Sequence, residues 1–163
     1  MDKIAVFTIA GEEFGIELNK IVEIIKPRKV TPVPKVPAFI SGMINLRGKV
    51  IPVMDLRARF SVKPSSSREK ILIAKMHGEE IGLIVDSVKE IINIEKEQIA
   101  SPPTIFRGLK PEYLKGIGKL GDRLIIILNL DSLLTAEEMV LLEERKENLN
   151  SGVLPGNISQ KPR

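Results

Sequence analysis

Short apolar segments alternate with polar turns along most of the chain. Residues 4–9, 13–18 and 22–26 are rich in isoleucine, valine and phenylalanine, and Gly11 and Pro27 lie between or after them. β-Branched and aromatic side chains favour a pleated sheet, whereas glycine and proline interrupt regular structure. The pattern therefore predicts β-strands at these positions rather than helices.

Two glycine-containing dipeptides, residues 47–48 and 121–122, lie between apolar runs of strand length and predict hairpin turns. The arms of the two hairpins are residues 43–46, 49–54, 117–120 and 123–128. Together with the other apolar segments, these arms predict about five strands in each half of the chain.

The sequence contains an internal repeat. Residues 11–25 align with residues 78–92 without a gap, and seven of the fifteen aligned positions are identical. A second block, residues 42–56, aligns with residues 116–130 in the same order. Two matches in one order indicate a duplicated unit of about sixty residues, which is near the lower size limit for independent folding. Five short strands per unit can close into a small barrel that leaves no sheet edge exposed.

The expected fold is therefore all-β, with two tandem five-stranded β-barrels forming a single domain over residues 1–148. The two lobes are expected at about residues 4–60 and 70–134, and exchange of strands between them is left open. Residues 61–69 contain a proline and three consecutive serines, which is typical of a surface connection between lobes.

A short helix is predicted after the second lobe. Thr135 and Glu138 have the spacing of a capping box, so the helix is expected over residues 135–148. Residues 149–163 are enriched in serine, glycine, proline and asparagine, and they are expected to form a disordered tail.

The sequence offers few residues for catalysis. It has no cysteine, which excludes disulfides, thiolate metal sites and a cysteine nucleophile. The one histidine, His77, precedes Gly78 in a predicted hairpin turn, where an exposed polar residue is ordinary. No glycine-rich segment is followed by the Lys-Ser or Lys-Thr pair of a phosphate loop. We therefore predict a protein that is not an enzyme, with no catalytic residue, no metal and no cofactor.

Three aspartates follow apolar strands and could be mistaken for catalytic groups: Asp55, Asp86 and Asp131. A carboxylate at the end of a strand commonly accepts hydrogen bonds from backbone N–H groups of the next turn. Capping is therefore the role expected for all three.

Composition places the chain among globular proteins, with 43% hydrophobic and 28% charged residues. The N-terminus runs directly into a strand-like segment, and the longest apolar run, residues 124–128, is too short to cross a bilayer. A cytoplasmic location without direct membrane insertion is expected.

The net charge of +4 makes a small basic β-barrel that binds nucleic acid the alternative function. Cations and carboxylates nevertheless alternate, as in the segment from Arg57 and Arg59 to Glu69, and aromatic residues make up only 4% of the chain. Few side chains are thus available to stack on bases, and no nucleic-acid binding is expected.

The two predicted hairpin turns differ in charge. Arg47 lies at the first turn, whereas the second turn has only Gly121 and Asp122. Arg47 is therefore either a solvated turn residue or a contact for a partner. Residues 102–106 are also unusual, because two prolines precede a threonine, an isoleucine and a phenylalanine, so this segment either covers the core or forms an interface.

The run Asn45-Leu46-Arg47-Gly48, followed by residues 51–57, resembles the signature of the CheW-type chemotaxis coupling proteins. Other segments resemble the same family in the same order: residues 6–9, 13–16, 37–42, 82–88 and 137–139. The resemblance covers residues 4 to 142, which is nearly the whole chain apart from the tail.

This resemblance implies two SH3-like barrels, no catalytic activity and an adapter role. Members of the family bind the regulatory domain of the histidine kinase CheA and the cytoplasmic tip of methyl-accepting chemotaxis receptors. The resemblance thus implies both partners for this chain, and a cytoplasmic protein that is recruited to membrane receptor arrays.

Carried over by position, the resemblance also implies site residues. A receptor groove between the barrels would involve Ile21, Glu23, Gly42, Arg47, Val85 and Val88. The kinase contact would involve Thr104 and Ile105. Within the receptor groove, Arg47 on the hairpin is expected to pair with Glu23 on a neighbouring strand.

Overall fold

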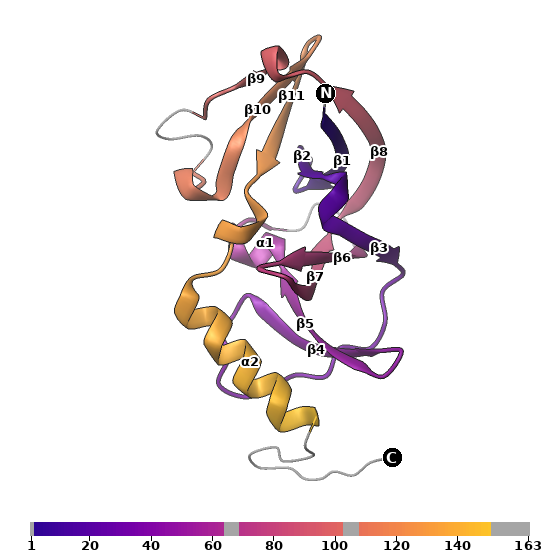
Figure 1. The fold of residues 1–163 in the computed structure, drawn as a ribbon, viewed down its shortest axis with the longest axis vertical. Helices are drawn as coiled ribbons and strands as arrows, with labels where there is room; N and C mark the ends of the chain where they lie inside the picture. Colours follow the sequence, from indigo (N-terminus) through magenta and orange to yellow (C-terminus); the bar gives the residue numbers. More distant parts are fainter. Residues whose placement is uncertain (1, 64–68, 103–107, 151–163) are drawn as a thin grey trace.

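The computed structural model describes residues 2–63, 69–102 and 108–150. Its strands form two curled sheets that follow one another along the long axis of the molecule, and helix α2 (Ala136–Asn150) runs beside the lower sheet (Figure 1). A single turn of helix, α1 (Leu56–Arg59), lies near the junction of the sheets (Figure 1). The expected fold class is confirmed, since the chain is mostly β-strand with one short C-terminal helix.

The first sheet has six strands in the order β8-β1-β2-β11-β10-β9. Their bounds are β8 (Ser87–Ile94), β1 (Asp2–Ile9), β2 (Glu12–Glu17), β11 (Arg123–Leu128), β10 (Leu114–Leu120) and β9 (Ile99–Ala100). Neighbouring strands are antiparallel except for β2 and β11, which are parallel.

The second sheet has five strands in the order β3-β6-β7-β5-β4. Their bounds are β3 (Ile21–Ile25), β6 (Lys70–Met76), β7 (Glu79–Val85), β5 (Lys49–Asp55) and β4 (Ile40–Leu46). Only β5 and β7 are parallel. Four 3₁₀ turns complete the described chain: η1 (Leu18–Lys20), η2 (Lys96–Gln98), η3 (Pro111–Tyr113) and η4 (Leu130–Ser132).

The two sheets exchange strands between the copies of the internal repeat. By the repeat alignment, β1 to β5 correspond to β6, β7, β8, β10 and β11. The first sheet combines the first two strands of the first copy with the last three of the second copy, and the second sheet does the reverse. The expected ranges 4–60 and 70–134 therefore each supply strands to both sheets, while the outer limits of the domain, 1–148, stay a prediction.

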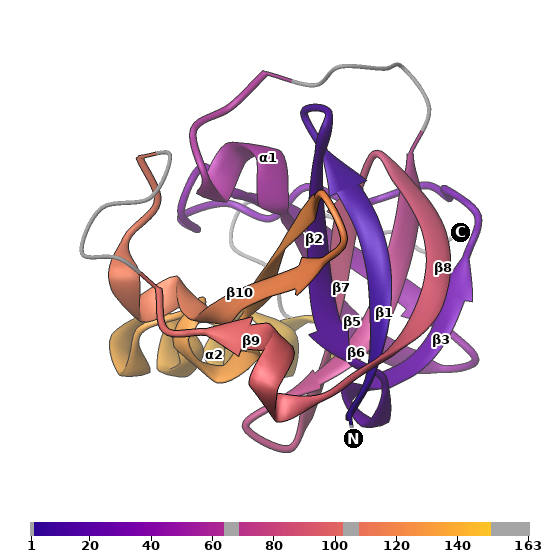
Figure 2. The same cartoon turned by 90° about the horizontal axis from the view of Figure 1, so that it is seen from above.

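The sheets are strongly curled, but the described ladders do not close them. Figure 2 shows the first sheet bending round from β8 to β10, and no hydrogen-bonded ladder within the described residues joins its two edge strands. The same holds for β3 and β4 at the edges of the second sheet.

One hydrophobic core extends across both sheets. Its largest cluster contains buried side chains of the first sheet and of the second sheet. Four aromatic rings contact one another in series through it. The centroid separations are 6.2 Å for the stacked pair Phe7–Phe14, 5.6 Å for the stacked pair Phe14–Phe60 and 5.6 Å for the tilted pair Phe60–Tyr113. The two sheets are therefore packed against each other as one unit.

Local sequence signals explain the turns and the helix start. Arg47 and Gly48 have φ values of 52° and 84°, as a two-residue hairpin with positive φ at both central positions requires, so the predicted hairpin is confirmed. At the start of α2, the Thr135 hydroxyl accepts from the backbone of Glu138 at 3.1 Å, and the Glu138 carboxylate accepts from the backbone of Thr135 at 2.8 Å. The predicted capping box is thus confirmed.

An exposed charge network joins three strands of the first sheet. Glu13 on β2 accepts hydrogen bonds from Lys89 on β8 at 2.8 Å and from Arg123 on β11 at 2.9 Å, and Arg123 also contacts Glu90 at 2.6 Å. The hydrogen bond from Lys89, and then those from Arg123, hold the pKa of Glu13 below its ordinary value, against the opposing effect of burial.

We expect Glu13→Gln to reduce the free energy of unfolding at neutral pH by about 0.5–1 kcal/mol, which is the scale of a well-formed surface pair. Because the folded-state pKa is depressed, the stabilisation by Glu13 is present above the unfolded pKa and is lost as the pH falls through the folded pKa. Urea titrations of the two proteins should therefore converge in acid. A difference that persists unchanged at acid pH would contradict this assignment.

Candidate functional site

The structure brings Arg47 and Glu23 together. The Arg47 guanidinium donates through Nη2 to Oε2 of Glu23, and the two side chains are 67% and 29% exposed. This ion pair links the β4–β5 turn to β3, so it connects the two edge strands of the second sheet. The turn itself is held by the side-chain oxygen of Asn45, which accepts from the backbone N–H of Gly48 at 3.0 Å. Arg47 is thus an exposed guanidinium that is paired with a neighbouring strand.

The strand that carries Glu23, β3, also exposes apolar side chains. Ile21 is half-buried and packs against the main core, while Val22 and Ile24 are 44% and 48% exposed. Exposing large aliphatic side chains to water is unfavourable. Two such side chains on an edge strand therefore favour contact with a partner that buries them. The sequence analysis did not single out Val22 and Ile24. These two residues alternate with half-buried neighbours along β3. The alternation indicates a possible contact surface only when β3 is known to be an edge strand, which the sequence does not show.

The two valines expected in the receptor groove differ in accessibility. Val88 on β8 is half-buried and packs against the main core. Val85 at the end of β7 is fully buried, so direct contact between its side chain and a partner does not fit this structure. Burial follows from the position of β7, a central strand that the protein covers on both faces. Ile91 on β8 is 59% exposed and is the accessible apolar residue of that strand.

Gly42 has a steric reason to be glycine. It lies in β4 with a φ of 146°, and a Cβ atom built on it would be 2.1 Å from the backbone oxygen of Thr31. Thr31 and Met43 exchange two backbone hydrogen bonds of 2.8 Å at this point. Gly42 therefore lets the segment that precedes β4 lie directly against the edge of the second sheet. The predicted kinase-contact residues Thr104 and Ile105 fall outside the described residues.

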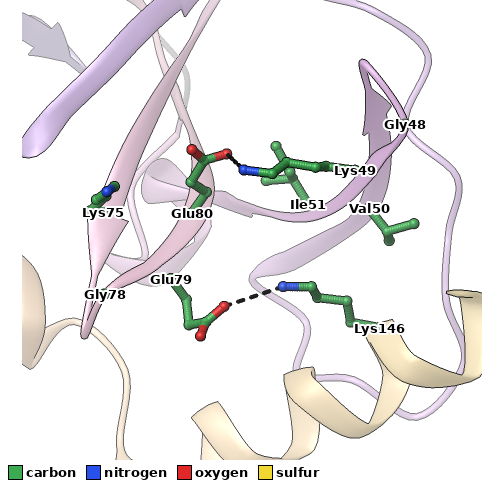
Figure 3. A pocket seen from close by; sticks show the side chains of 9 residues that line it. All are labelled: Gly48, Lys49, Val50, Ile51, Lys75, Gly78, Glu79, Glu80 and Lys146. Atoms are coloured by element: carbon green, nitrogen blue, oxygen red, sulfur yellow. Dashed lines mark hydrogen bonds and ion pairs between the residues drawn. The ribbon is translucent and has the colours of Figure 1, made fainter.

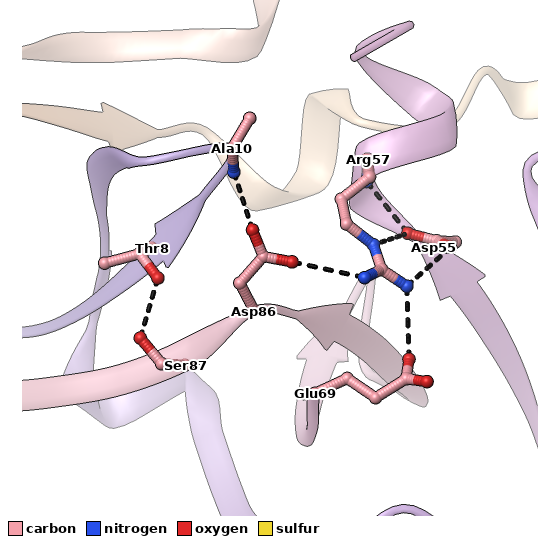
Figure 4. Close-up of polar contacts among 7 residues, drawn as sticks. All are labelled: Thr8, Ala10, Asp55, Arg57, Glu69, Asp86 and Ser87. Carbon is pink, nitrogen blue, oxygen red and sulfur yellow. Dashed lines mark hydrogen bonds and ion pairs between the residues drawn. The ribbon is translucent and has the colours of Figure 1, made fainter. Parts of the chain in front are cut away.

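A buried arginine near the sheet junction was not anticipated from the sequence. Arg57 in α1 is 8% exposed, and it contacts Asp55, Asp86 and Glu69 at 2.9, 3.2 and 3.1 Å (Figure 4). Two of its nitrogens contact the two oxygens of Asp55, and this bidentate hydrogen bonding is the main cause that raises the pKa of Arg57 above its ordinary value, against burial.

Arg57 also connects the two sheets. Asp86 follows β7 and precedes β8; one of its oxygens accepts from Arg57, and the other accepts from the backbone N–H of Ala10 at 2.7 Å. Ala10 belongs to the β1–β2 turn of the first sheet, whereas Asp55 ends β5 of the second. The sequence analysis grouped Arg57 with scattered surface charges, and this interpretation is wrong. The sequence signal for this buried ion pair was an arginine, Arg57, two residues after an aspartate that ends a strand, Asp55.

The capping role expected for the three aspartates is confirmed for Asp55 only, because Asp86 and Asp131 accept from backbone N–H groups far along the chain. Asp55 accepts from the backbone N–H of Arg57 at 2.9 Å, Asp86 accepts from Ala10, and Asp131 accepts from the backbone N–H of His77 at 2.9 Å. The ring of His77 is exposed at the β6–β7 turn, where its Nε2 donates to the backbone oxygen of Asp131 at 2.8 Å. His77 therefore has a structural contact at a hairpin tip.

A cleft of about 500 Å³ lies between the β4–β5 turn, the β6–β7 turn and α2 (Figure 3). Its charges are mixed and mostly paired, because Lys49 contacts Glu80 at 3.5 Å and Lys146 contacts Glu79 at 3.3 Å. Such a lining offers no concentrated charge of one sign for a ligand. Among the described residues, no group of three or more His, Cys, Asp or Glu side chains could hold a metal ion, and no helix is long and apolar enough to cross a membrane.

Comparisons with a family model and with curated proteins indicate the same family. The CheW-like domain model matches residues 3–138. The chemotaxis protein CheW of Klebsiella aerogenes is 36% identical over 140 residues, covering 85% of this chain and 84% of that protein. The corresponding protein of Bacillus subtilis is 33% identical over 138 residues, with 83% and 88% coverage.

Structure comparison agrees. The crystal structure of the scaffolding protein TtCheW from Thermoanaerobacter tengcongensis matches with a TM-score of 0.78 at 38% identity, over 84% of this chain and 90% of that one. The family match spans both sheets, including the Arg47 hairpin and the Arg57 junction. The chain therefore belongs to the CheW-like domain family.

Proposed function

We propose that this chain is a non-catalytic adapter that couples methyl-accepting chemotaxis receptors to the histidine kinase CheA. The relatives are named chemotaxis proteins, and the matching crystal structure is described as a scaffolding protein. In this proposal the chain works in the cytoplasm and is recruited to receptor arrays at the membrane. The kinase contact would be made with its regulatory domain, at a surface that includes Thr104 and Ile105.

The observation that carries the receptor half of the proposal is the Arg47–Glu23 pair on an exposed edge. The same edge strand that holds the guanidinium through Glu23 also exposes Val22 and Ile24, so a directional donor and apolar area are both accessible at β3. A helical segment can place apolar side chains on such a strand while a polar group contacts the arginine. Ile21 and Val88 remain part of the proposed receptor groove as half-buried residues, whereas the buried Val85 could affect it only indirectly.

Replacing Arg47 with histidine tests the receptor site. We expect Arg47→His to weaken binding of a receptor-tip fragment by about 1–3 kcal/mol, because a charge-assisted contact at the interface is lost. Thermal unfolding should change little, since the side chain is 67% exposed. Kinase affinity should also be unchanged. All three quantities can be measured side by side for the two proteins by calorimetry and titration.

Two results would contradict this assignment. If Arg47→His unfolds at a clearly lower temperature, the arginine is needed for the fold rather than for recognition. If receptor and kinase affinities fall together, the hairpin does not distinguish the two partners. Lys119→His is a matched control, because Lys119 is an exposed cation on β10 of the other sheet and its substitution leaves the pair with Glu23 intact.

A further inference from the structure

The loop between β3 and β4, residues 26–39, carries a concentrated positive charge. The side chains of Lys26, Arg28, Lys29 and Lys35 are exposed, and the loop contains no carboxylate. Within the part of the chain that the structure describes, none of these four side chains takes part in a salt bridge, whereas most other arginines do. Four positively charged side chains without neighbouring carboxylates form a surface that attracts anionic groups.

Backbone hydrogen bonds and buried apolar side chains hold the loop against the rest of the protein. Thr31 and Met43 form an isolated two-bond bridge, Val33 is buried, and Val36 and Phe39 pack against the main core. Four prolines lie within the loop and fix further backbone angles. The apolar residues thus point inward while the cations point outward. A partner would bind these cations with a smaller loss of conformational entropy than it would on a flexible tail.

The loop continues the surface that contains Arg47. It begins directly after β3, which carries Glu23, and it descends beside the β4–β5 hairpin (Figure 1). Gly42 allows this course, because a side chain there would collide with the backbone of Thr31. Along one side of the second sheet, exposed Val22 and Ile24 are therefore followed by Lys26, with no other element between them.

We propose that this basic loop is a second, electrostatic part of the receptor site and that it binds carboxylate side chains on the protein segment that Arg47 recognises. This inference rests on the proposed function. A protein partner fits better than a polyphosphate or a lipid surface, because Lys26 directly follows a strand with exposed aliphatic side chains, Val22 and Ile24. A protein segment can supply both carboxylates and apolar side chains, whereas a polyphosphate or a layer of lipid headgroups presents anions without exposed apolar groups.

The test compares two triple variants that lower the net charge equally, from +4 to +1. The loop variant is Lys26→Gln/Arg28→Gln/Lys29→Gln. The matched control is Lys75→Gln/Lys96→Gln/Lys119→Gln, which removes three exposed lysines from β6, η2 and β10. The probe is a receptor-tip fragment, titrated at about 0.05 M and about 0.5 M salt, where exposed charges are weakly and strongly screened.

We expect the loop variant to bind the receptor fragment about tenfold more weakly than the natural protein at low salt, and about equally at high salt. The control variant should lose less than about threefold at low salt. Kinase affinity should be equal in all three proteins. The inference would be overturned if both variants lost the same receptor affinity. It would also be overturned if the receptor affinity of the loop variant depended on salt as strongly as that of the natural protein.

Two further outcomes separate this inference from the proposed function. Receptor binding that depends on Arg47 but not on the loop overturns the inference alone, whereas the absence of any receptor binding by the natural protein overturns both. Co-sedimentation with vesicles of anionic lipid is measured in parallel. If the loop variant loses vesicle binding while its receptor affinity is unchanged, the loop faces a membrane surface and the inference is wrong.

Discussion

Arg57→Met is expected to lower the free energy of unfolding by about 3–5 kcal/mol, because it removes one partner of a buried ion pair. The side chain of Arg57 is 9% exposed, and its guanidinium contacts Asp55, Asp86 and Glu69. Without it, the Asp86 carboxylate, whose side chain is 3% exposed, keeps its burial but loses a neutralising charge. Urea unfolding of the two proteins at neutral pH measures the difference.

Arg47→Met is the matched control for Arg57→Met, because it makes the same substitution, and the same change in charge, at an exposed position. Arg47 is 67% exposed, so the same substitution there should cost less than about 1 kcal/mol. Similar losses at the two positions would show that the junction network contributes no more than a surface pair. Arg57→Lys is a second comparison, since it retains the charge but cannot form the bidentate contact with Asp55.

Gly42→Ala is expected to destabilise the protein by about 2–4 kcal/mol, through overlap between the new methyl group and backbone atoms. The built Cβ lies 2.1 Å from the Thr31 oxygen and 2.7 Å from the Thr31 carbonyl carbon. Since neither is the end of a flexible side chain, the loop must move away from β4 and break the Thr31–Met43 bridge. Receptor-fragment affinity should fall with it, because the loop and the Arg47 hairpin flank the same surface.

Gly48→Ala separates steric overlap from backbone strain. Gly48 also has a positive φ, 84°, but a Cβ built on it meets nothing within 4 Å. Its substitution should therefore cost only about 1 kcal/mol, the penalty of placing alanine at positive φ. Equal losses at Gly42 and Gly48 in thermal and urea unfolding would refute the steric account of Gly42.

Most of the strands could be predicted because their signals are local. Apolar runs bounded by glycine and proline placed β1, β2 and β3, and the turn at Arg47 and Gly48 fixed the register of one hairpin. The capping box likewise depends only on Thr135 and Glu138. Each of these features is decided within a few residues, so no knowledge of the distant chain was needed.

Pairing between distant segments could not be predicted in the same way. The two copies of the repeat present similar apolar patterns, so β6 offers a partner to β3 as readily as β1 does, and the sequence leaves both arrangements open. Burial of Arg57 and Val85 depends on this choice, because both residues lie where the sheets meet. The Arg47–Glu23 pair was expected only from the family resemblance, since nothing local to either residue indicates the other.

The exchange of strands has a consequence for the origin of the fold. A single copy of the repeat contains no complete sheet, since its first two strands find their partners β8, β10 and β11, or β3, β4 and β5, in the other copy. An ancestral gene that encoded one unit would thus have needed an intertwined homodimer to bury its apolar strands. The present chain is equivalent to such a dimer fused through residues 61–69. Fusion freed the two halves to diverge, and only one of them now presents an arginine at its hairpin tip.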